Sequence, residues 1–359
     1  MVNIVFRKMF LFYLALALAA TPVELLAAHK KSSKRIISSQ KNTLTKHRIS
    51  SRYKAKATKV GTKRVNVRLR SSHQLQNTTL HQYEAYDNYD GSGVLQLASS
   101  KALVINQNTG ETIYAKNTNL PTPIASITKL MTAMVMLDAK QSLDEVIYVS
   151  NEDIDYLKGT GSRLSIGSGL ARSDMLQLAL MASENRAASS LATNYPGGRY
   201  KFVKAMNAKA LELTLNNTHF VDPTGLDSEN VSTAEDLAKM VQAAYQYPEI
   251  RLATTSPSHE VYLEGRAYPV NFNNTNGLVR GGEWQIGLSK TGFINEAGRC
   301  LVMQATIAGE PMILVLLDSN GKLSRIGDAN RIRKWMEYNS DPITTTTGQT
   351  HPVVVGKIS

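Results

Sequence analysis

Three short stretches decide the fold of this chain: Ser126-Ile127-Thr128-Lys129, Ser183-Glu184-Asn185 and Lys290-Thr291-Gly292, in this order. A serine with a lysine three residues later, a second serine with an asparagine, and a Lys-Thr-Gly stretch are the three parts of one kind of serine acyl-transfer site. Each motif alone is weak evidence for such a site, because Ser-x-x-Lys recurs at Ser38, Ser51 and Ser319, and Ser-Glu-Asn recurs at Ser228–Asn230. Only Ser126 and Ser183 border long apolar helical segments, so these two are the predicted serines of the site.

The first stretch places an amine beside a hydroxyl. Lys129 lies at i+3 from Ser126, on the same face of a predicted helix. A serine hydroxyl is a poor nucleophile until a base takes its proton, and a free lysine is charged at neutral pH. The ammonium of Lys290, at about 5 Å and an effective dielectric of about 20, would repel that of Lys129 by roughly 3 kcal/mol. This repulsion, with some burial, would lower the pKa of Lys129 enough for it to act as a general base. The alternative is that Ser126 only caps a helix and Lys129 is only a surface charge.

The other two stretches supply polar groups. Ser183 can relay a proton to a leaving amine, and the Asn185 amide can bind a peptide carbonyl; either could instead be a cap or a loop hydrogen bond. Lys290 and Thr291 suit a carboxylate or carbonyl oxygen at the end of a strand that could pair with an extended peptide. Gly292 allows a close backbone approach.

The hydrophobic pattern has strands at both ends and helices between them, which predicts an α/β (α+β) fold: one antiparallel sheet packed with helices, plus a mostly helical lobe. Short links such as Gly309-Glu310-Pro311 require antiparallel pairing. The expected strands are Lys101–Ile105, Thr112–Ala115, Val261–Leu263, Trp284–Lys290, Leu301–Ile307 and Met312–Leu317. The expected helices are Ile127–Leu137, Asp174–Thr193, Tyr200–Leu215, Thr233–Tyr247 and Leu323–Tyr338.

Outside this pattern the ends of the chain differ in composition. Residues 1–28 are typical of a secretory signal, with Arg7 and Lys8 before an apolar run that is short for a membrane span; a retained N-terminal anchor is the alternative. Residues 29–95 form a predicted disordered basic linker, in which residues 29–83 hold fifteen Lys and Arg and no Asp or Glu. Residues 96–340 are the predicted folded domain, and 341–359 a disordered tail.

Charge and cysteine content exclude several classes. The chain carries a net charge of +12, but the basic linker and signal account for it, and the remainder is slightly acidic. We therefore expect no nucleic-acid partner, while the linker could contact anionic envelope polymers or lipid headgroups or serve as a solvated spacer. Cys300 is the only cysteine and is expected in the core. The histidines have no ligand spacing, so no metal and no cofactor are predicted.

Longer stretches around the motifs resemble a known family: Pro123–Ala133, Ala182–Ala188, Phe220–Leu226 and Ser232–Ala238. They are similar to the low-molecular-mass penicillin-binding proteins and, within these, to the D-alanyl-D-alanine endopeptidases of the bacterial periplasm. The resemblance implies the transpeptidase fold shared with β-lactamases, and a periplasmic enzyme that cuts peptide cross-links in peptidoglycan.

By the same resemblance, each motif residue has a role. Ser126 forms an acyl-enzyme, Lys129 is its base, and the backbone N–H groups of Ser126 and Phe293 form the oxyanion hole. The site is completed by Ser183 as a catalytic residue and by Asn185, Lys290, Thr291 and Gly292 as substrate-binding residues. A β-lactam is expected to acylate Ser126 and to leave slowly.

Three alternatives remain from the sequence. A serine β-lactamase uses a glutamate in a Glu-x-x-Leu-Asn pattern; Glu212–Asn216 fits this spacing but lies in a helical repeat, so we interpret it as structural. A D-alanyl-D-alanine carboxypeptidase is more similar to an endopeptidase than a β-lactamase is. Two features favour the endopeptidase: Glu184, at a position where carboxypeptidases often have glycine, and the short chain after Tyr338. A non-catalytic penicillin- or cell-wall-binding protein is the third, which the complete set of motif side chains disfavours.

Overall fold

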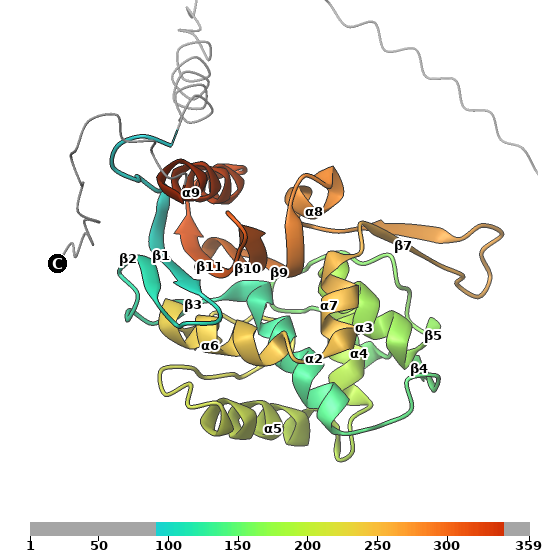
Figure 1. Ribbon diagram of the computed structural model, residues 1–359. Helices are drawn as coiled ribbons and strands as arrows, with labels where there is room; N and C mark the ends of the chain where they lie inside the picture. Colours follow the sequence, from blue (N-terminus) through green and yellow to red (C-terminus); the bar gives the residue numbers. More distant parts are fainter. Residues whose placement is uncertain (1–90, 341–359) are drawn as a thin grey trace, which may run out of the picture. The chain divides into compact units, whose positions relative to one another are not determined.

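The computed structural model describes residues 91–340 (Figure 1). The predicted signal (1–28), the linker up to residue 90 and the tail (341–359) lie outside the described residues, so their assignments stay predictions. Within the described part, a five-stranded antiparallel sheet has the order β2-β1-β11-β10-β9. Its strands are β1 (Ser99–Asn106), β2 (Thr112–Lys116), β9 (Gln285–Ile294), β10 (Gly298–Ile307) and β11 (Glu310–Ser319). The predicted antiparallel sheet, completed by the N-terminal hairpin, is confirmed.

The sheet is buried on both faces because its central strands are apolar on both. In β11, Ile313 and Val315 belong to one hydrophobic cluster, while Leu314 and Leu316, pointing the other way, belong to a second. Helix α9 (Ser324–Ser340) packs on the second face and α6 (Ala234–Ala244) on the first. Figure 1 shows α9 above the sheet and α6 below it.

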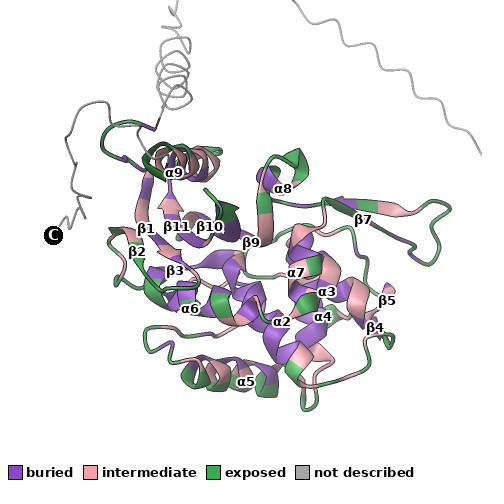
Figure 2. Cartoon of the chain, viewed as in Figure 1, coloured by how far each residue is buried: buried purple, intermediate pink, exposed green. Residues whose placement is uncertain are grey.

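The helical lobe continues from the face that α6 covers. At its centre is α2 (Lys129–Asp138), in which every residue from Lys129 to Met136 is buried (Figure 2), which confirms the prediction of a helix that is apolar on nearly every side. The other helices are η1 (Ala125–Thr128), η2 (Asn151–Asp153), α3 (Arg172–Met181), α4 (Asn185–Thr193), α5 (Gly198–Glu212), α7 (Pro248–Thr255) and α8 (Gly277–Gly281). Three two-stranded pairs complete the described residues: β3 (Thr122–Pro123) with β6 (Val231–Ser232), β4 (Val146–Tyr148) with β5 (Gly169–Ala171), and β7 (Ser258–Val261) with β8 (Val270–Asn273).

Two predicted elements were wrong in detail. The single helix expected over Asp174–Thr193 is two helices, α3 and α4, because Ser183 adopts a left-handed conformation (φ 57°) that ends the first. The interruption of the apolar run Met175–Ala182 at Ser183, which the spacing of Ser183 and Asn185 also predicts, is confirmed. The strand expected at Val261–Leu263 is instead β7, which pairs with β8 and ends at Val261. The polar residues of β7 conceal it from a search for apolar runs.

A buried carboxylate fastens the first strand to the last helix. Asp328 of α9 is fully buried and accepts hydrogen bonds from the backbone N–H groups of Ala98 (2.9 Å) and Ser99 (2.8 Å). Its other partners are the Ser99 hydroxyl at 2.5 Å and the guanidinium of Arg331. The start of β1 is thereby fixed against α9.

Asp328→Ala is expected to destabilise the protein by about 3 to 5 kcal/mol, because it removes the carboxylate partner of Arg331 and leaves two buried N–H donors without their acceptor. Denaturant unfolding measures the change. Glu337→Ala on the same helix is the matched control: its 2.8 Å pair with Arg333 is partly exposed to solvent, so its loss costs less than about 1 kcal/mol. Equal effects of the two substitutions would contradict this role of Asp328.

Candidate active site

Ser126 lies in η1, directly before the buried helix α2. Its hydroxyl is 2.8 Å from the amine of Lys129, which opens α2. The pair is one turn apart on the same face, as the spacing predicts. Ala125, immediately before the serine, has a φ of 47°, an unfavourable conformation for a residue with a side chain.

The amine of Lys129 is surrounded by three oxygen atoms. Besides Ser126 Oγ, it lies 2.7 Å from Asn185 Oδ1 and 2.7 Å from the backbone carbonyl of Thr224. The amide and backbone oxygens can only accept hydrogen bonds, whereas the hydroxyl can also donate. A neutral amine has two N–H donors and one lone pair, so it matches this set when its lone pair accepts the Ser126 proton. The geometry can therefore hold the serine and its base ready for proton transfer.

Burial makes the neutral form of Lys129 accessible. The side chain is fully buried, and desolvation lowers its pKa to about 7, with the charges of Asp222 and Glu184 acting in the opposite direction. From the sequence we predicted a lowered pKa for Lys129 but attributed it mainly to repulsion from Lys290. That attribution was wrong, because desolvation is the largest effect.

Lys290 is the second buried amine of the site. Its Nζ lies 2.9 Å from Ser183 Oγ and 2.9 Å from the Thr291 carbonyl. Burial lowers its pKa well below the ordinary value, and the charge of Lys129 lowers it further. The two lysines thus divide the two serines between them: Lys129 contacts Ser126, and Lys290 contacts Ser183.

The break between α3 and α4 positions the second motif. The left-handed turn at Ser183 lets the N–H of Glu184 bond the carbonyl of Leu178, and α4 then begins at Asn185. The Asn185 side chain is oriented at both ends, since its Oδ1 accepts from Lys129 and its Nδ2 donates to Thr160 Oγ1 at 3.0 Å. Thr160 was not predicted from the sequence; no motif marks it.

Strand β9 brings the third motif against the nucleophile. A Cβ at Gly292 would lie 2.9 Å from the Ile124 carbonyl and 3.1 Å from the backbone nitrogen of Ser126, so only glycine allows this approach. Thr291 Oγ1 bonds Thr275 Oγ1 at 2.7 Å. The ring of Phe293 is half exposed, with the Arg299 guanidinium 4.5 Å from its centroid. All eight predicted site residues therefore lie on the segments that meet here.

A loop that the sequence did not assign to the site carries Thr224. The Asp222 carboxylate folds it by accepting the N–H groups of Thr224 (2.5 Å), Gly225 (2.8 Å) and Asp227 (2.9 Å). Gly225 has a φ of +80°, and a Cβ there would lie 1.9 Å from the Ala125 carbonyl. The Asp-Pro-Thr-Gly turn was visible in the sequence, but a contact that a backbone carbonyl makes with Lys129 leaves no side-chain signature.

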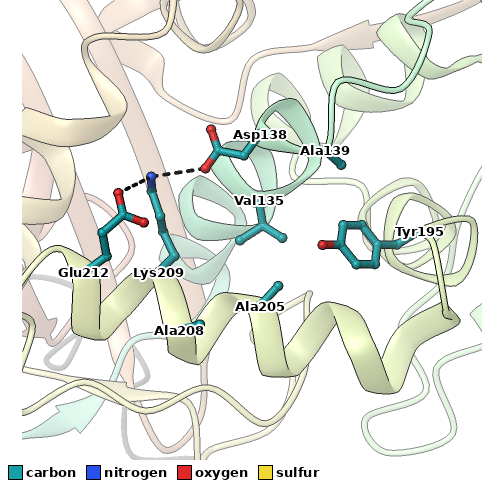
Figure 3. A pocket seen from close by; sticks show the side chains of 8 residues that line it. All are labelled: Val135, Asp138, Ala139, Tyr195, Ala205, Ala208, Lys209 and Glu212. Atoms are coloured by element: carbon teal, nitrogen blue, oxygen red, sulfur yellow. Dashed lines mark hydrogen bonds and ion pairs between the residues drawn. The ribbon is translucent and has the colours of Figure 1, made fainter. Parts of the chain in front are cut away.

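The remaining sequence candidates have structural roles. Glu212, of the β-lactamase-like pattern, is exposed at the end of α5 and bonds Lys209 at 3.0 Å. It lines a pocket between α2 and α5 (Figure 3), to which none of the motif residues contributes; the volume of this pocket is about 220 Å³. Cys300 is buried, as predicted. Ser319 ends β11 and bonds Ser99 Oγ at 2.7 Å.

Residues 91–340 contain no group of three or more His, Cys, Asp or Glu side chains arranged to hold a metal ion. The same part of the chain has no helix with the length and hydropathy needed to cross a bilayer.

The site has two buried lysines, each hydrogen-bonded to a serine hydroxyl, at the edge strand of an antiparallel sheet. This arrangement defines a serine acyltransferase of the penicillin-binding class. A family model described as D-alanyl-D-alanine carboxypeptidase matches residues 87–321, and the chain belongs to this family of serine peptidases, S11. A D-alanyl-D-alanine endopeptidase of Pseudomonas aeruginosa is 52% identical over 67% of this chain and 78% of its own. One of Escherichia coli K12 is 47% identical over 74% of this chain and 82% of its own.

Solved structures agree with this assignment. The Streptomyces K15 DD-transpeptidase superposes with a TM-score of 0.63 at 28% identity, over 68% of this chain and 98% of its own. Penicillin-binding protein D2 of Listeria monocytogenes, in its cefotaxime-bound form, gives a TM-score of 0.59 at 29% identity, over 68% and 98% of the two chains. The predicted fold is confirmed.

Gly225→Ala is expected to destabilise the protein and to slow acylation of Ser126, because the new methyl group would displace the backbone of Ala125. The loss should exceed the 1 to 2 kcal/mol, roughly, that a left-handed conformation costs an alanine. Gly110→Ala is the matched control, since Gly110 also has positive φ (+74°) but its Cβ would meet no atom within 4 Å. Thermal unfolding and benzylpenicillin labelling measure both; equal losses would show that the clash is unimportant.

The rate of acylation is expected to rise with pH through the pKa of Lys129, about 7, because only the neutral amine accepts the serine proton. The charge of Glu184 raises this pKa, so Glu184→Gln should lower it and move the rising limb to lower pH. The measurement is the second-order rate of benzylpenicillin acylation against pH, with Glu212→Gln as control. A limb that stays in place or moves upward in Glu184→Gln would contradict the assignment.

Proposed function

We propose that this protein is a D-alanyl-D-alanine endopeptidase that hydrolyses peptide cross-links in peptidoglycan through a serine acyl-enzyme. The observation that carries the proposal is the buried amine of Lys129, held between the Ser126 hydroxyl and two oxygens that can only accept. This arrangement supplies a nucleophile and its base at neutral pH.

The proposed reaction begins when Ser126 Oγ attacks the carbonyl carbon of a D-alanine residue while its proton passes to Lys129 Nζ. The backbone N–H groups of Ser126 and Phe293 bind the oxyanion, a type of contact that typically contributes around 3 kcal/mol. The close approach of Gly292 to the Ser126 nitrogen supports this pairing. Ser183, bonded to Lys290, passes a proton to the leaving amine, and water then hydrolyses the ester and restores the serine.

Substrate binding is assigned to the remaining motif residues. Asn185 donates its amide to a peptide carbonyl, and Lys290 and Thr291 face a carboxylate or carbonyl oxygen of the substrate. Strand β9 is the edge of its sheet, so an extended peptide can add to it through main-chain hydrogen bonds.

Endopeptidase action is preferred to carboxypeptidase action on two grounds. The relatives at 52% and 47% identity are both named D-alanyl-D-alanine endopeptidase, although the family model takes its name from the carboxypeptidases. The second ground is Glu184, a buried carboxylate between Ser183 and Asn185, at a position where the carboxypeptidases often have glycine.

β-Lactams are proposed as covalent inhibitors. They present a strained amide to Ser126, and the ester that forms retains its leaving group, which hinders attack by water. The likeness to a penicillin-binding protein solved with cefotaxime supports this.

Export to the periplasm is part of the proposal, supported by the signal-like composition of residues 1–28. We further propose that the basic segment 29–83 contacts anionic envelope components through screened charge attraction. Fractionation of cells tests the first; salt-dependent binding of the full chain, compared with a chain lacking residues 29–83, to purified cell-wall material tests the second.

Digestion of cross-linked muropeptide dimers is the decisive measurement. The wild type is expected to release monomers, and Ser126→Ala to release none, because it lacks the nucleophile. Ser38→Ala, which removes the serine of another Ser-x-x-Lys stretch, is the matched control and should behave as wild type.

Chromatography and mass spectrometry of the products separate the alternatives. Loss of terminal D-alanine without monomer release would establish a carboxypeptidase. Labelling of Ser126 by benzylpenicillin with no product of either kind would establish a binding protein.

A further inference from the structure

A loop of the helical lobe, residues 155–161, is folded by its own first side chain. The Asp155 carboxylate accepts the N–H groups of Leu157 (2.9 Å), Lys158 (2.9 Å) and Thr160 (2.8 Å), and the Thr160 hydroxyl at 2.7 Å. The loop has little apolar support, since Tyr156 and Leu157 are 82% and 61% exposed. Polar contacts therefore determine where it lies.

Two further contacts of the loop reach two different segments of the active site. Thr160 Oγ1 accepts the amide of Asn185, which also touches Lys129. Two residues earlier, Lys158 Nζ lies 2.5 Å from Glu296 Oε1, in the turn between β9 and β10. Glu296 follows Gly292 by four residues. Through this loop, the ion pair connects the segment that carries Asn185 to the turn that follows β9.

We propose that the Lys158–Glu296 ion pair is a strap across the substrate groove that selects substrates by size. The inference rests on the proposed function, because it concerns how a cross-linked peptide enters that site. A cross-linked peptide continues on both sides of its scissile bond and must part the strap, whereas a small β-lactam reaches Ser126 beneath it.

The Lys158–Glu296 ion pair can break readily, and the chain beside it can move. Its two side chains are 27% and 42% exposed, so water and salt weaken the pair. Gly159 adjoins Lys158 with a φ of +65°, and a Cβ at Gly159 or Gly161 would meet no atom within 4 Å, so both glycines have room to move.

The segment after the strap is anchored separately. Arg163 donates to the Asn271 carbonyl at 2.5 Å, and its guanidinium lies 3.7 Å from the centroid of the Phe272 ring on β8. Parting the Lys158–Glu296 pair therefore leaves this attachment of the loop in place. The loop can move over the groove while its C-terminal end stays fixed.

The test compares two reactions of the same full-length protein: hydrolysis of a cross-linked muropeptide dimer and acylation by benzylpenicillin. Glu296→Gln and Lys158→Gln should each raise kcat/KM for the dimer about two- to fivefold, the weight of an exposed ion pair, and leave the acylation rate unchanged. Added salt should raise dimer hydrolysis by the wild type more than by Glu296→Gln.

Two controls isolate the strap. The double variant Lys158→Glu with Glu296→Lys restores an ion pair of opposite polarity and should return the dimer rate to the wild-type value. Glu337→Gln, which removes a charge from a partly exposed pair on α9, should change neither reaction.

Other outcomes overturn the inference. An unchanged ratio of the two rates in both single variants would show that the pair does not control entry. A parallel fall in both rates would show that it orders the site instead. A wild type that is acylated but never cleaves dimers would refute the proposed function itself, a result distinct from the other two.

Discussion

The rest of the site depends on the burial of one amine. An ammonium group removed from water is strongly destabilised unless it is paired. Lys129 is fully buried, and the oxygens that surround its amine belong to a hydroxyl, an amide and a backbone carbonyl, none of them a carboxylate. The fold resolves this conflict by favouring the neutral form, which is also the form that can take a proton from Ser126. Stability of the buried side chain and activation of the nucleophile are therefore the same requirement.

Two glycines from different segments enforce the geometry of that pair. Gly292 brings β9, and Gly225 brings the loop of Thr224, against the backbone around Ala125, where a side chain on either would collide. Ala125 itself has positive φ, a strained conformation that persists only where its surroundings fix it. Local strain before the nucleophile is thus balanced by packing from both sides, and the serine remains partly accessible while its base is sealed.

The sequence could predict those parts of the molecule that side chains encode. Apolar strands with short links fix an antiparallel sheet, and the motif order identifies the segments that meet. It could not predict contacts made through the backbone, such as the Thr224 carbonyl on Lys129. The spacing of Ser183 and Asn185 indicated an interruption of the helical run there, but not the left-handed backbone conformation that produces it. The sequence also indicated the wrong main cause for the lowered pKa of Lys129, because desolvation depends on how many atoms surround a group, which no motif records.

Binding of an anionic substrate would shift the pKa values of the two lysines in opposite directions. Burial lowers the pKa of both, and both ammonium groups in one cleft repel each other. An anionic group of a substrate beside Lys290 would favour its charged form. The nearby positive charge then lowers the pKa of Lys129 further, since like charges disfavour protonation. By this reasoning an incoming carboxylate beside Lys290 would itself help to keep Lys129 in the neutral form that acts as the base.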